Sequence, residues 1–92
     1  MSYAIRFEPT AQREYLRLPK ELRDRIAARV NALSDDPRPP GAEPLRGKLK
    51  GLRRLRVGDY RVSYEADDDR QIVTIVEVGH RRDVYRRLAR RW

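Results

Sequence analysis

Two runs of alternating apolar and polar residues flank Gly58-Asp59, and this pattern constrains the fold more than any other feature of the chain. The runs cover residues 53–57 and 60–64, and a Gly-Asp pair between them is typical of a two-residue hairpin turn. The segment is therefore predicted to be a tight antiparallel β-hairpin. Such a turn fixes which residues face each other across the strands, namely Val57 with Tyr60, Arg56 with Arg61, Leu55 with Val62 and Arg54 with Ser63.

The same alternation sorts the side chains of the hairpin onto two faces, because successive residues of a strand point to opposite sides of a sheet. One face is basic and carries Arg54, Arg56 and Arg61. Like charges directly opposite one another cost a few tenths to about 1 kcal/mol, so the fold gains nothing from this pairing by itself. The pattern therefore favours a surface over which an anion binds. The other face is apolar and carries Leu55, Val57, Tyr60, Val62 and Tyr64.

Residues 11–33 have the periodicity of two helices. Their apolar residues recur at spacings of three and four, which is typical of one face of a helix. Pro19 divides the segment, because proline cannot continue a helix but suits a first turn. Thr10 is the predicted N-cap of the first helix. The apolar face of the first helix comprises Ala11, Tyr15 and Leu18, and that of the second comprises Leu22, Ile26, Val30 and Leu33.

The rest of the chain completes one α+β domain over residues 1–92. Residues 3–7 alternate as a strand does, and residues 71–79 are rich in β-branched side chains and predict another strand. The proline-rich residues 34–44 predict a loop, and the acidic residues 67–69 a hairpin loop. We expect an N-terminal strand and a two-helix hairpin packed on an antiparallel-rich sheet of about four strands, with a short basic C-terminal segment.

The basic charge is concentrated in the second half of the chain. The whole sequence has 22 Lys+Arg against 14 Asp+Glu, a net charge of +8. Residues 46–92 carry a net charge of +7, whereas residues 1–45 carry +1. This asymmetry predicts a nearly neutral scaffold with a cationic working surface for a polyanion.

The inventory of side chains excludes several classes of chemistry. The chain has no cysteine and a single histidine, His80, which argues against a disulfide framework, a metal site or a zinc hydrolase. No glycine-rich phosphate loop and no Ser-His-Asp set is suggested, and no cofactor is expected. No apolar run is long enough to span a bilayer and no signal peptide begins the chain, so we expect a cytoplasmic protein without a membrane partner.

RNA cleavage is a reaction that suits this inventory. The ribose 2′-OH can attack the adjacent phosphorus if it is held in line, if charge on the phosphate is stabilised and if two protons are transferred. Guanidinium groups grip phosphate bidentately but are poor acids. The candidates for proton transfer are therefore Tyr85, whose phenolate nearby arginines would stabilise, and His80.

Two segments resemble the RelE toxins of the RelE/ParE superfamily of bacterial toxin–antitoxin systems. They are residues 56–64 (RVGDYRVSY) and residues 78–85 (VGHRRDVY), and the resemblance extends over nearly the whole chain, including residues 44–47 (PLRG). It implies a ribosome-dependent, metal-independent endoribonuclease that cleaves mRNA in the A site and leaves a cyclic phosphate.

The resemblance also implies roles for individual residues. Arg61 would stabilise the scissile phosphate, with Arg54 and Arg56 assisting from the neighbouring strand. Arg81 would act on the leaving 5′ oxygen, and Tyr85 would assist as the base on the 2′-OH. Further RNA contacts are expected from Lys48, Lys50, Arg53, His80 and Arg82.

One position departs from the family pattern. RelE-like enzymes often place lysines on the strand where this chain has Leu52 and Arg54. Leu52 cannot replace a cation, so cleavage is expected to be weaker than in stronger family members unless His80 takes over a proton transfer. Lys48 and Lys50 lie just upstream and are candidates to supply the missing charge.

The resemblance implies a RelB-like antitoxin as the partner, with an acidic binding segment that suits the charge of +8. Ribosome and mRNA would be the other partners, and operator DNA would be bound only through the antitoxin complex. Two alternatives remain open. A ParE-like relative would inhibit DNA gyrase without cleaving RNA, and a degenerate relative would bind antitoxin or nucleic acid without catalysis.

Overall fold

The elements follow the predicted order along the chain. The structure is a computed structural model that describes residues 2–83, so the basic C-terminal segment beyond Asp83 lies outside the described residues. The elements are β1 (Ala4–Phe7), α1 (Pro9–Leu16), α2 (Lys20–Ala32), β2 (Glu43–Pro44), a 3-10 turn η1 (Gly47–Leu49), β3 (Arg53–Val57), β4 (Tyr60–Asp67) and β5 (Ile72–His80).

The strands form one mixed sheet in the order β1-β5-β4-β3-β2. The strand β1 runs parallel to β5, and the other neighbours are antiparallel. The sheet thus has five strands in the described chain instead of about four, because the end of the segment expected to be a loop pairs with β3. This short strand β2 has only two residues, which is too few to show an alternating pattern.

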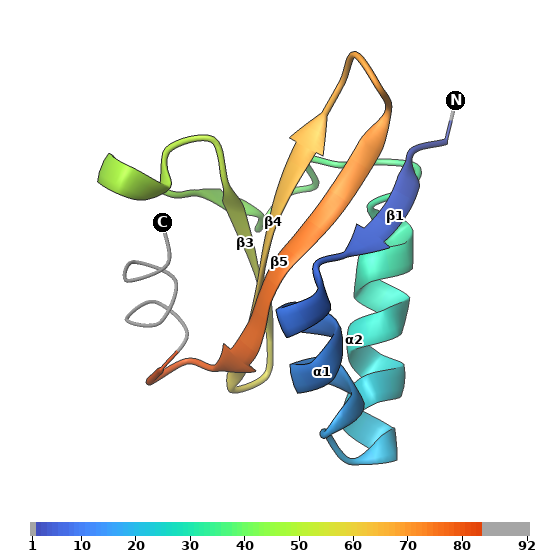
Figure 1. The fold of residues 1–92 in the computed structure, drawn as a ribbon, viewed down its shortest axis with the longest axis vertical. Coiled ribbons are helices and arrows are strands. Elements are labelled where there is room, and N and C mark those ends of the chain that lie inside the picture. The colour runs from blue at the N-terminus through green and yellow to red at the C-terminus, as the bar shows by residue number, and fades with distance from the viewer. Residues whose placement is uncertain (1, 84–92) are drawn as a thin grey trace.

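The two helices cover one face of the sheet (Figure 1). The stripe expected on α2 is confirmed, because Ile26, Val30 and Leu33 are buried and Leu22 packs against them. They meet the apolar face of the strands, whose buried members are Leu55, Val57, Val62, Tyr64, Val73, Ile75 and Val78. None of the helices in residues 2–83 is long and apolar enough to cross a membrane.

The start of α1 differs from the expectation. The helix begins at Pro9 with Glu8 as its N-cap, so Thr10 is a helical residue and not the cap. Proline suits this position because its missing N–H would have no partner in the first turn of a helix. The second helix begins at Lys20 with Pro19 as its N-cap, so Pro19 separates the two helices as expected but precedes the second helix instead of being its first residue.

The register of the β3–β4 hairpin is confirmed at all four predicted pairs. Gly58 has a φ of +59°, a conformation that glycine adopts without the steric cost that a side chain would add. The apolar side chains of the hairpin therefore face the helices, and its arginines at positions 54, 56 and 61 face the other way.

A latch at one end of the molecule ties three distant segments together. The Asp68 carboxylate, in the β4–β5 loop, accepts two hydrogen bonds from the Arg38 guanidinium at 3.0 Å each. It also accepts one from the Tyr3 hydroxyl at 2.7 Å. Close by, Tyr64 donates its hydroxyl to the Pro37 carbonyl at 2.7 Å, and burial raises the pKa of this phenol above its ordinary value.

We expect Asp68→Asn to destabilise the protein at neutral pH and to lose this effect as the pH falls below about 4. The hydrogen bonds from Arg38 and Tyr3 hold the pKa of the Asp68 carboxyl below its ordinary value of 3.8. Folding is therefore favoured by the ionised form, and this stability is present above pH 3.8 and lost as the pH falls through the lower folded pKa.

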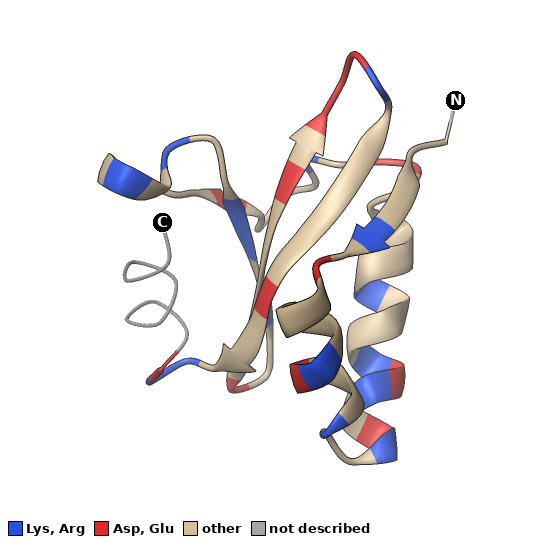
Figure 2. Cartoon of the chain, viewed as in Figure 1, with Lys and Arg blue, Asp and Glu red and all other residues tan. Residues whose placement is uncertain are grey.

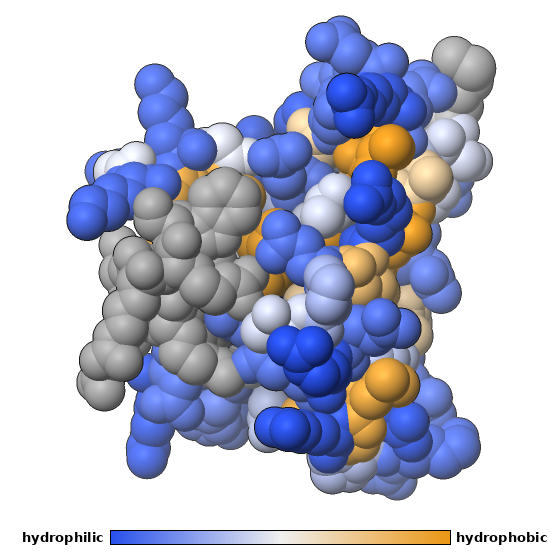
Figure 3. Space-filling model, in the orientation of Figure 1, coloured by the Kyte–Doolittle hydropathy of each residue, from blue (hydrophilic) through white to orange (hydrophobic). Residues whose placement is uncertain are grey.

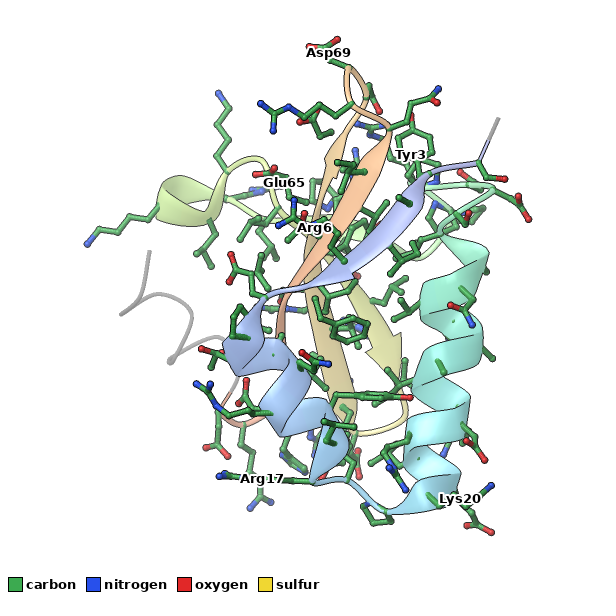
Figure 4. All side chains as sticks on the ribbon, turned by 45° about the vertical axis from the view of Figure 1, so that its right-hand side comes forward. Tyr3, Arg6, Arg17, Lys20, Glu65 and Asp69 are labelled. Carbon is green, nitrogen blue, oxygen red and sulfur yellow. The ribbon has the colours of Figure 1, made fainter. Side chains whose placement is uncertain are left out.

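Thermal melts of the wild type and Asp68→Asn from about pH 3 to about pH 7 measure this dependence. The control is Asp69→Asn, because Asp69 lies at the exposed tip of the same loop (Figure 4). A stability difference between wild type and Asp68→Asn that stayed constant over this range would contradict the assignment.

Candidate functional site

The face of the sheet opposite the helices carries two rows of side chains that cross neighbouring strands. We call this surface the basic face; it comprises Arg54, Arg56 and Arg61 and the residues in line with them. In one row Arg56 pairs with Arg61, which pairs with Gly79. The other row runs across β2, β3, β4 and β5 through Glu43, Arg54, Ser63 and Glu77.

Arg61 presents part of its guanidinium for binding. Its Nη1 donates to the Gly58 carbonyl at 2.8 Å and to the Tyr60 carbonyl at 2.9 Å, which fixes the group against the hairpin turn. A guanidinium has five N–H donors, and those on Nε and Nη2 have no partner among residues 2–83. Arg61 is therefore a positioned cation with donors left for a phosphate.

Arg56 is exposed and carries a weak intramolecular partner. Its side chain is 64% exposed, and its Nη2 lies 3.6 Å from Oε1 of Glu43. Its backbone carbonyl accepts a hydrogen bond from Arg29 on α2 at 3.1 Å. The Glu43 carboxylate and the carbonyls that hold Arg61 offset the repulsion between Arg56 and Arg61. Groups of the protein itself thus balance part of the charge for which the hairpin alone suggested a bound anion.

Glu77 on β5 is the feature of the basic face that the sequence analysis missed. Its side chain is 1% exposed, and it lies across Ser63 from Arg54, whose Nε and Nη2 are also buried. A break in the alternation of residues 75–78 (IVEV) was the available signal, because strict alternation would put Glu77 on the same side as Ile75 in the core.

A backbone hydrogen bond holds Arg81 beside the β3–β4 hairpin turn. Its N–H donates to the Asp59 carbonyl in the hairpin turn at 2.8 Å, which continues the pairing of β4 with β5 beyond His80. The side chains of Arg81 and Arg82 are exposed. The structure thus places Arg81 beside the turn that holds the Arg61 guanidinium.

His80 lies on the other side of the sheet. It pairs with Tyr60, and the two rings meet edge to face at a centroid distance of 5.6 Å. Tyr60 packs against the helix-covered core, and Nδ1 of His80 accepts a hydrogen bond from the Arg82 N–H at 3.2 Å. The expectation that His80 could replace a missing lysine on the basic face is therefore unsupported by its orientation.

Arg53 is also separated from the basic face. It shares the face of β3 that carries Leu55 and Val57, and its Nη1 donates to the Ala42 carbonyl at 3.3 Å. Lys48 and Lys50 are exposed in and directly after η1, the blue-marked turn that projects from the sheet in Figure 2. Of these three predicted RNA contacts, the two lysines are exposed, and Arg53 is partly buried.

Leu52 is a core residue and not an open position for a cation. It is 3% exposed and packs with Leu49 and Val76 in a second small cluster, against which Leu45 lies. The cluster anchors the loop that carries Lys48 to the sheet. The departure from the family pattern at this position thus has a structural cause in this chain.

We expect Leu52→Lys to destabilise the protein by about 2 kcal/mol or more, because it removes a buried leucine and brings a charge toward an apolar cluster. Leu16→Lys is the matched control, since Leu16 is 56% exposed. Urea denaturation of both variants measures the change in the free energy of unfolding. Equal stability of the two variants would show that Leu52 does not contribute to a core.

A cavity of about 490 Å³ lies beside this cluster, at the end of the sheet where β3 begins. Its lining contains no carboxylate. On the face of the molecule that Figure 3 shows, hydrophilic residues predominate and hydrophobic residues form small patches. A basic lining over an apolar floor favours anionic ligands that have an apolar part. The floor includes Leu45 and Leu52, and the cations are Arg38, Arg46, Lys50 and Arg53.

The remaining predictions for the site concern acid–base chemistry and metals. Tyr85, the predicted base, lies outside the described residues. No group of histidine, aspartate and glutamate side chains that could hold a metal ion occurs within residues 2–83. The described part of the site therefore consists of arginines, lysines and a buried carboxylate.

Comparisons with known proteins agree with this architecture. Residues 5–85 match the family described as the ParE toxin of the type II toxin–antitoxin system parDE. Toxin RelG of Mycobacterium tuberculosis is 41% identical over 90 residues, which cover 95% of this chain and all of the relative. Toxin RelE of the same organism is 36% identical over 85 residues, which cover 91% of this chain and 87% of the relative.

Solved structures have the same fold. In the toxin–antitoxin complex RelBE2 of Mycobacterium tuberculosis, a chain matches with a TM-score of 0.78 and 33% identity, covering 87% of this chain and 99% of that one. A mutant of Escherichia coli RelE in the free state matches with a TM-score of 0.80 at 23% identity, which is a likeness of fold, covering 99% and 98%.

These findings define the protein as a toxin of a type II toxin–antitoxin system. The chain belongs to the RelE/ParE toxin family.

Proposed function

We propose that this toxin is a ribosome-dependent, metal-independent endoribonuclease that cleaves mRNA in the A site and so inhibits translation. The observation that carries the proposal is the geometry of Arg61. Its guanidinium is fixed by two backbone carbonyls and keeps the donors of Nε and Nη2 for a phosphate. Arg56 lies opposite it on the next strand, and the backbone of Arg81 is bonded to the adjacent turn.

The proposed reaction is an internal transesterification. The ribose 2′ oxygen bonds to the adjacent phosphorus, the bond from phosphorus to the 5′ oxygen breaks, and a 2′,3′-cyclic phosphate is left. Arg61 stabilises the charge that develops on the non-bridging oxygens, because a preorganised donor is effective where charge builds up. By resemblance to RelE, Tyr85 accepts the proton of the 2′-OH and Arg81 assists the leaving 5′ oxygen.

The wider basic surface would position the RNA. Lys48, Lys50, Arg56 and Arg82 are exposed, and phosphate contacts of this kind give affinity without sequence preference. The cavity beside β3 adds cations over an apolar floor, which suits a nucleotide. This distribution supports a nucleic acid substrate, and the ribosome would supply the alignment that a small protein cannot.

A cognate antitoxin is the proposed protein partner. The solved relatives include a RelBE2 complex from Mycobacterium tuberculosis and an archaeal RelE-RelB complex from Pyrococcus horikoshii. A net charge of +8 favours a RelB-like partner with an acidic binding segment. Operator DNA would be bound only through the antitoxin complex, and both proteins would act in the cytoplasm.

Inhibition of DNA gyrase is the second candidate function. The matching family is described by its ParE member, and the sequence is compatible with a ParE-like activity. The arginine arrangement around Arg61 favours RNA cleavage, because inhibition of gyrase does not require a positioned phosphate ligand.

Primer extension on mRNA bound to programmed ribosomes tests the proposal. A discrete cut in the A-site codon is expected with the wild type, in buffer containing a chelator and in its absence. The same preparation is assayed for inhibition of supercoiling by gyrase. Cleavage without gyrase inhibition supports the endoribonuclease; gyrase inhibition without cleavage assigns the second function. If a folded protein showed neither activity, the remaining interpretation would be a module that binds antitoxin or nucleic acid without catalysis.

A further inference from the structure

Glu77 is a buried carboxylate on a basic surface, and none of the roles proposed above uses it. Its side chain is 1% exposed, and one of its oxygens, Oε1, accepts a hydrogen bond from the Val78 N–H at 3.2 Å. Burying a carboxylate is costly unless it is paired or hydrogen-bonded. The fold keeps this group on the basic face, where its interaction with cations can offset that cost.

A β-bulge directs Glu77 to this face. Ser63 pairs with Glu77, but the next residue, Tyr64, pairs with Ile75, so Val76 is an extra residue in β5. Without it, strict alternation from the core residue Ile75 would place Glu77 among the buried apolar side chains. The bulge is thus the structural device that turns the carboxylate toward the arginines.

Arg54 is the cation in the same row. Directly opposite residues on neighbouring strands have Cβ atoms about 5 Å apart. Arg54 on β3 and Glu77 on β5 are separated by one strand, β4. The side chain between them is Ser63, which is small, fully buried and has no hydrogen-bond partner for its Oγ within residues 2–83. The Arg54 Nε and Nη2 are buried as well. Both ionisable groups are therefore enclosed on the same side of the sheet.

Arg61 is held differently. Its guanidinium turns toward the Gly58 and Tyr60 carbonyls, at the hairpin turn and away from the row of Glu77. The hairpin thus fixes Arg61 through its own backbone. In the row of Arg54, the buried group of opposite charge is the Glu77 carboxylate.

We propose that Glu77 is a positioning residue, whose buried carboxylate orients the Arg54 guanidinium toward the phosphate that Arg61 binds. The proposal rests on the endoribonuclease function for its kinetic consequence. A long side chain that is already held in one orientation does not lose further conformational entropy when the transition state forms. The effect of Glu77 on Arg54 is therefore expected in the rate of cleavage. Binding of RNA depends chiefly on the exposed cations and is largely independent of Glu77.

Single-turnover cleavage of ribosome-bound mRNA at increasing toxin concentration tests the kinetic consequence. We expect Glu77→Gln to lower the maximal rate about 10- to 100-fold, since a small misplacement of a catalytic group has an effect of this order. The half-saturating concentration should change by less than about threefold, because the exposed cations remain. Glu77→Asp, which keeps the charge, should recover part of the rate.

The matched control is Glu65→Gln, an exposed acid on β4 whose side chain lies on the same face of the sheet (Figure 4). This variant loses the same charge and should cleave as the wild type does. Equal rates for Glu77→Gln and Glu65→Gln would overturn the proposal. Circular dichroism and thermal melts of each variant establish that rates are compared between folded proteins.

A double-mutant cycle tests whether Glu77 acts through Arg54. In an Arg54→Ala background, Glu77→Gln should have almost no further effect on the rate, because the group that it orients is absent. An undiminished effect of Glu77→Gln in that background would show that Glu77 acts on the reaction by another route.

A readout without RNA separates this proposal from the proposed function. In ¹⁵N-labelled protein, the Arg54 Nε–H signal should be sharp and protected from exchange, since this atom is buried. Glu77→Gln should broaden the signal or abolish its protection, and Glu65→Gln should leave it unchanged. If the wild type cleaves no RNA but the signal behaves in this way, the proposed function fails and the positioning of Arg54 stands. An unaltered signal in Glu77→Gln would refute the positioning itself.

Discussion

Arg61→Ala is expected to lower the rate of mRNA cleavage on the ribosome by about 100- to 1,000-fold, the effect of removing one preorganised donor from a developing charge. The hairpin turn holds the guanidinium through the Gly58 and Tyr60 carbonyls, so its orientation is fixed before the substrate binds. Arg56, its neighbour on the basic face, is instead 64% exposed, and its ion-pair partner is the Glu43 carboxylate at 3.6 Å. Neighbouring cations should therefore replace its charge only in part.

The measurement is primer extension under single-turnover conditions, with Arg17→Ala as the control. Arg17 is exposed at the end of α1, in the helical layer on the other side of the sheet (Figure 4). Both variants lose one positive charge, so a loss confined to Arg61→Ala separates a positioned group from general attraction to RNA. If both variants lost activity equally, Arg61 would be a binding cation and not a catalytic group.

The second large effect is expected on stability. Leu33→Ala should reduce the free energy of unfolding by about 2–5 kcal/mol, because Leu33 is fully buried between α2 and the sheet. A small domain has few such contacts to lose, and the melting temperature should fall by about 10 °C or more. Leu16→Ala makes the same chemical change at a side chain that is 56% exposed, and it should cost less than about 1 kcal/mol.

Chemical denaturation of the two leucine variants provides the comparison. A cost for Leu33→Ala no larger than that for Leu16→Ala would contradict the placement of the core between helices and sheet. The pair also calibrates the proposed site variants, since a loss of cleavage without a loss of stability of this order reflects the site itself.

The β3–β4 hairpin shows how far local sequence determines structure. Its register follows from the alternation of residues and from a two-residue turn, both of which are local properties. The turn glycine adopts the positive φ that the turn requires. The sequence alone therefore identified the face on which Arg54, Arg56 and Arg61 lie, before any tertiary contact was known.

Side chains at strand ends and irregularities were less predictable. Arg53 and His80 were expected to contact RNA, but each lies on the side of the sheet that the helices cover. For His80 the reason is the bulge at Val76, which reverses the alternation for the rest of β5. Strict alternation from Ile75 would therefore assign His80 to the wrong face, whereas alternation from Leu55 already places Arg53 on the apolar face of β3.

The burial of Leu52 could be recognised only from tertiary contacts. From the sequence it was a missing cation, and in the structure it closes an apolar cluster with Leu49 and Val76. The loop residues around Leu49 have no periodicity that would predict this packing. Contacts between a loop and a distant strand are not encoded in any short window of sequence.

The sequence by itself determined the elements, the hairpin register, the family and the basic charge of one face, because these depend on periodicity, turn chemistry and composition. Only the tertiary structure decided which cationic side chains are exposed, which are fixed by hydrogen bonds and which lie on the helix-covered side of the sheet. It also decided that a buried carboxylate lies among the arginines of the basic face. The physical reason is that orientation of a long side chain depends on its neighbours across strands. Two examples are the pair of carbonyls that hold Arg61 and the bulge that places Glu77 on the same face of the sheet as Arg54.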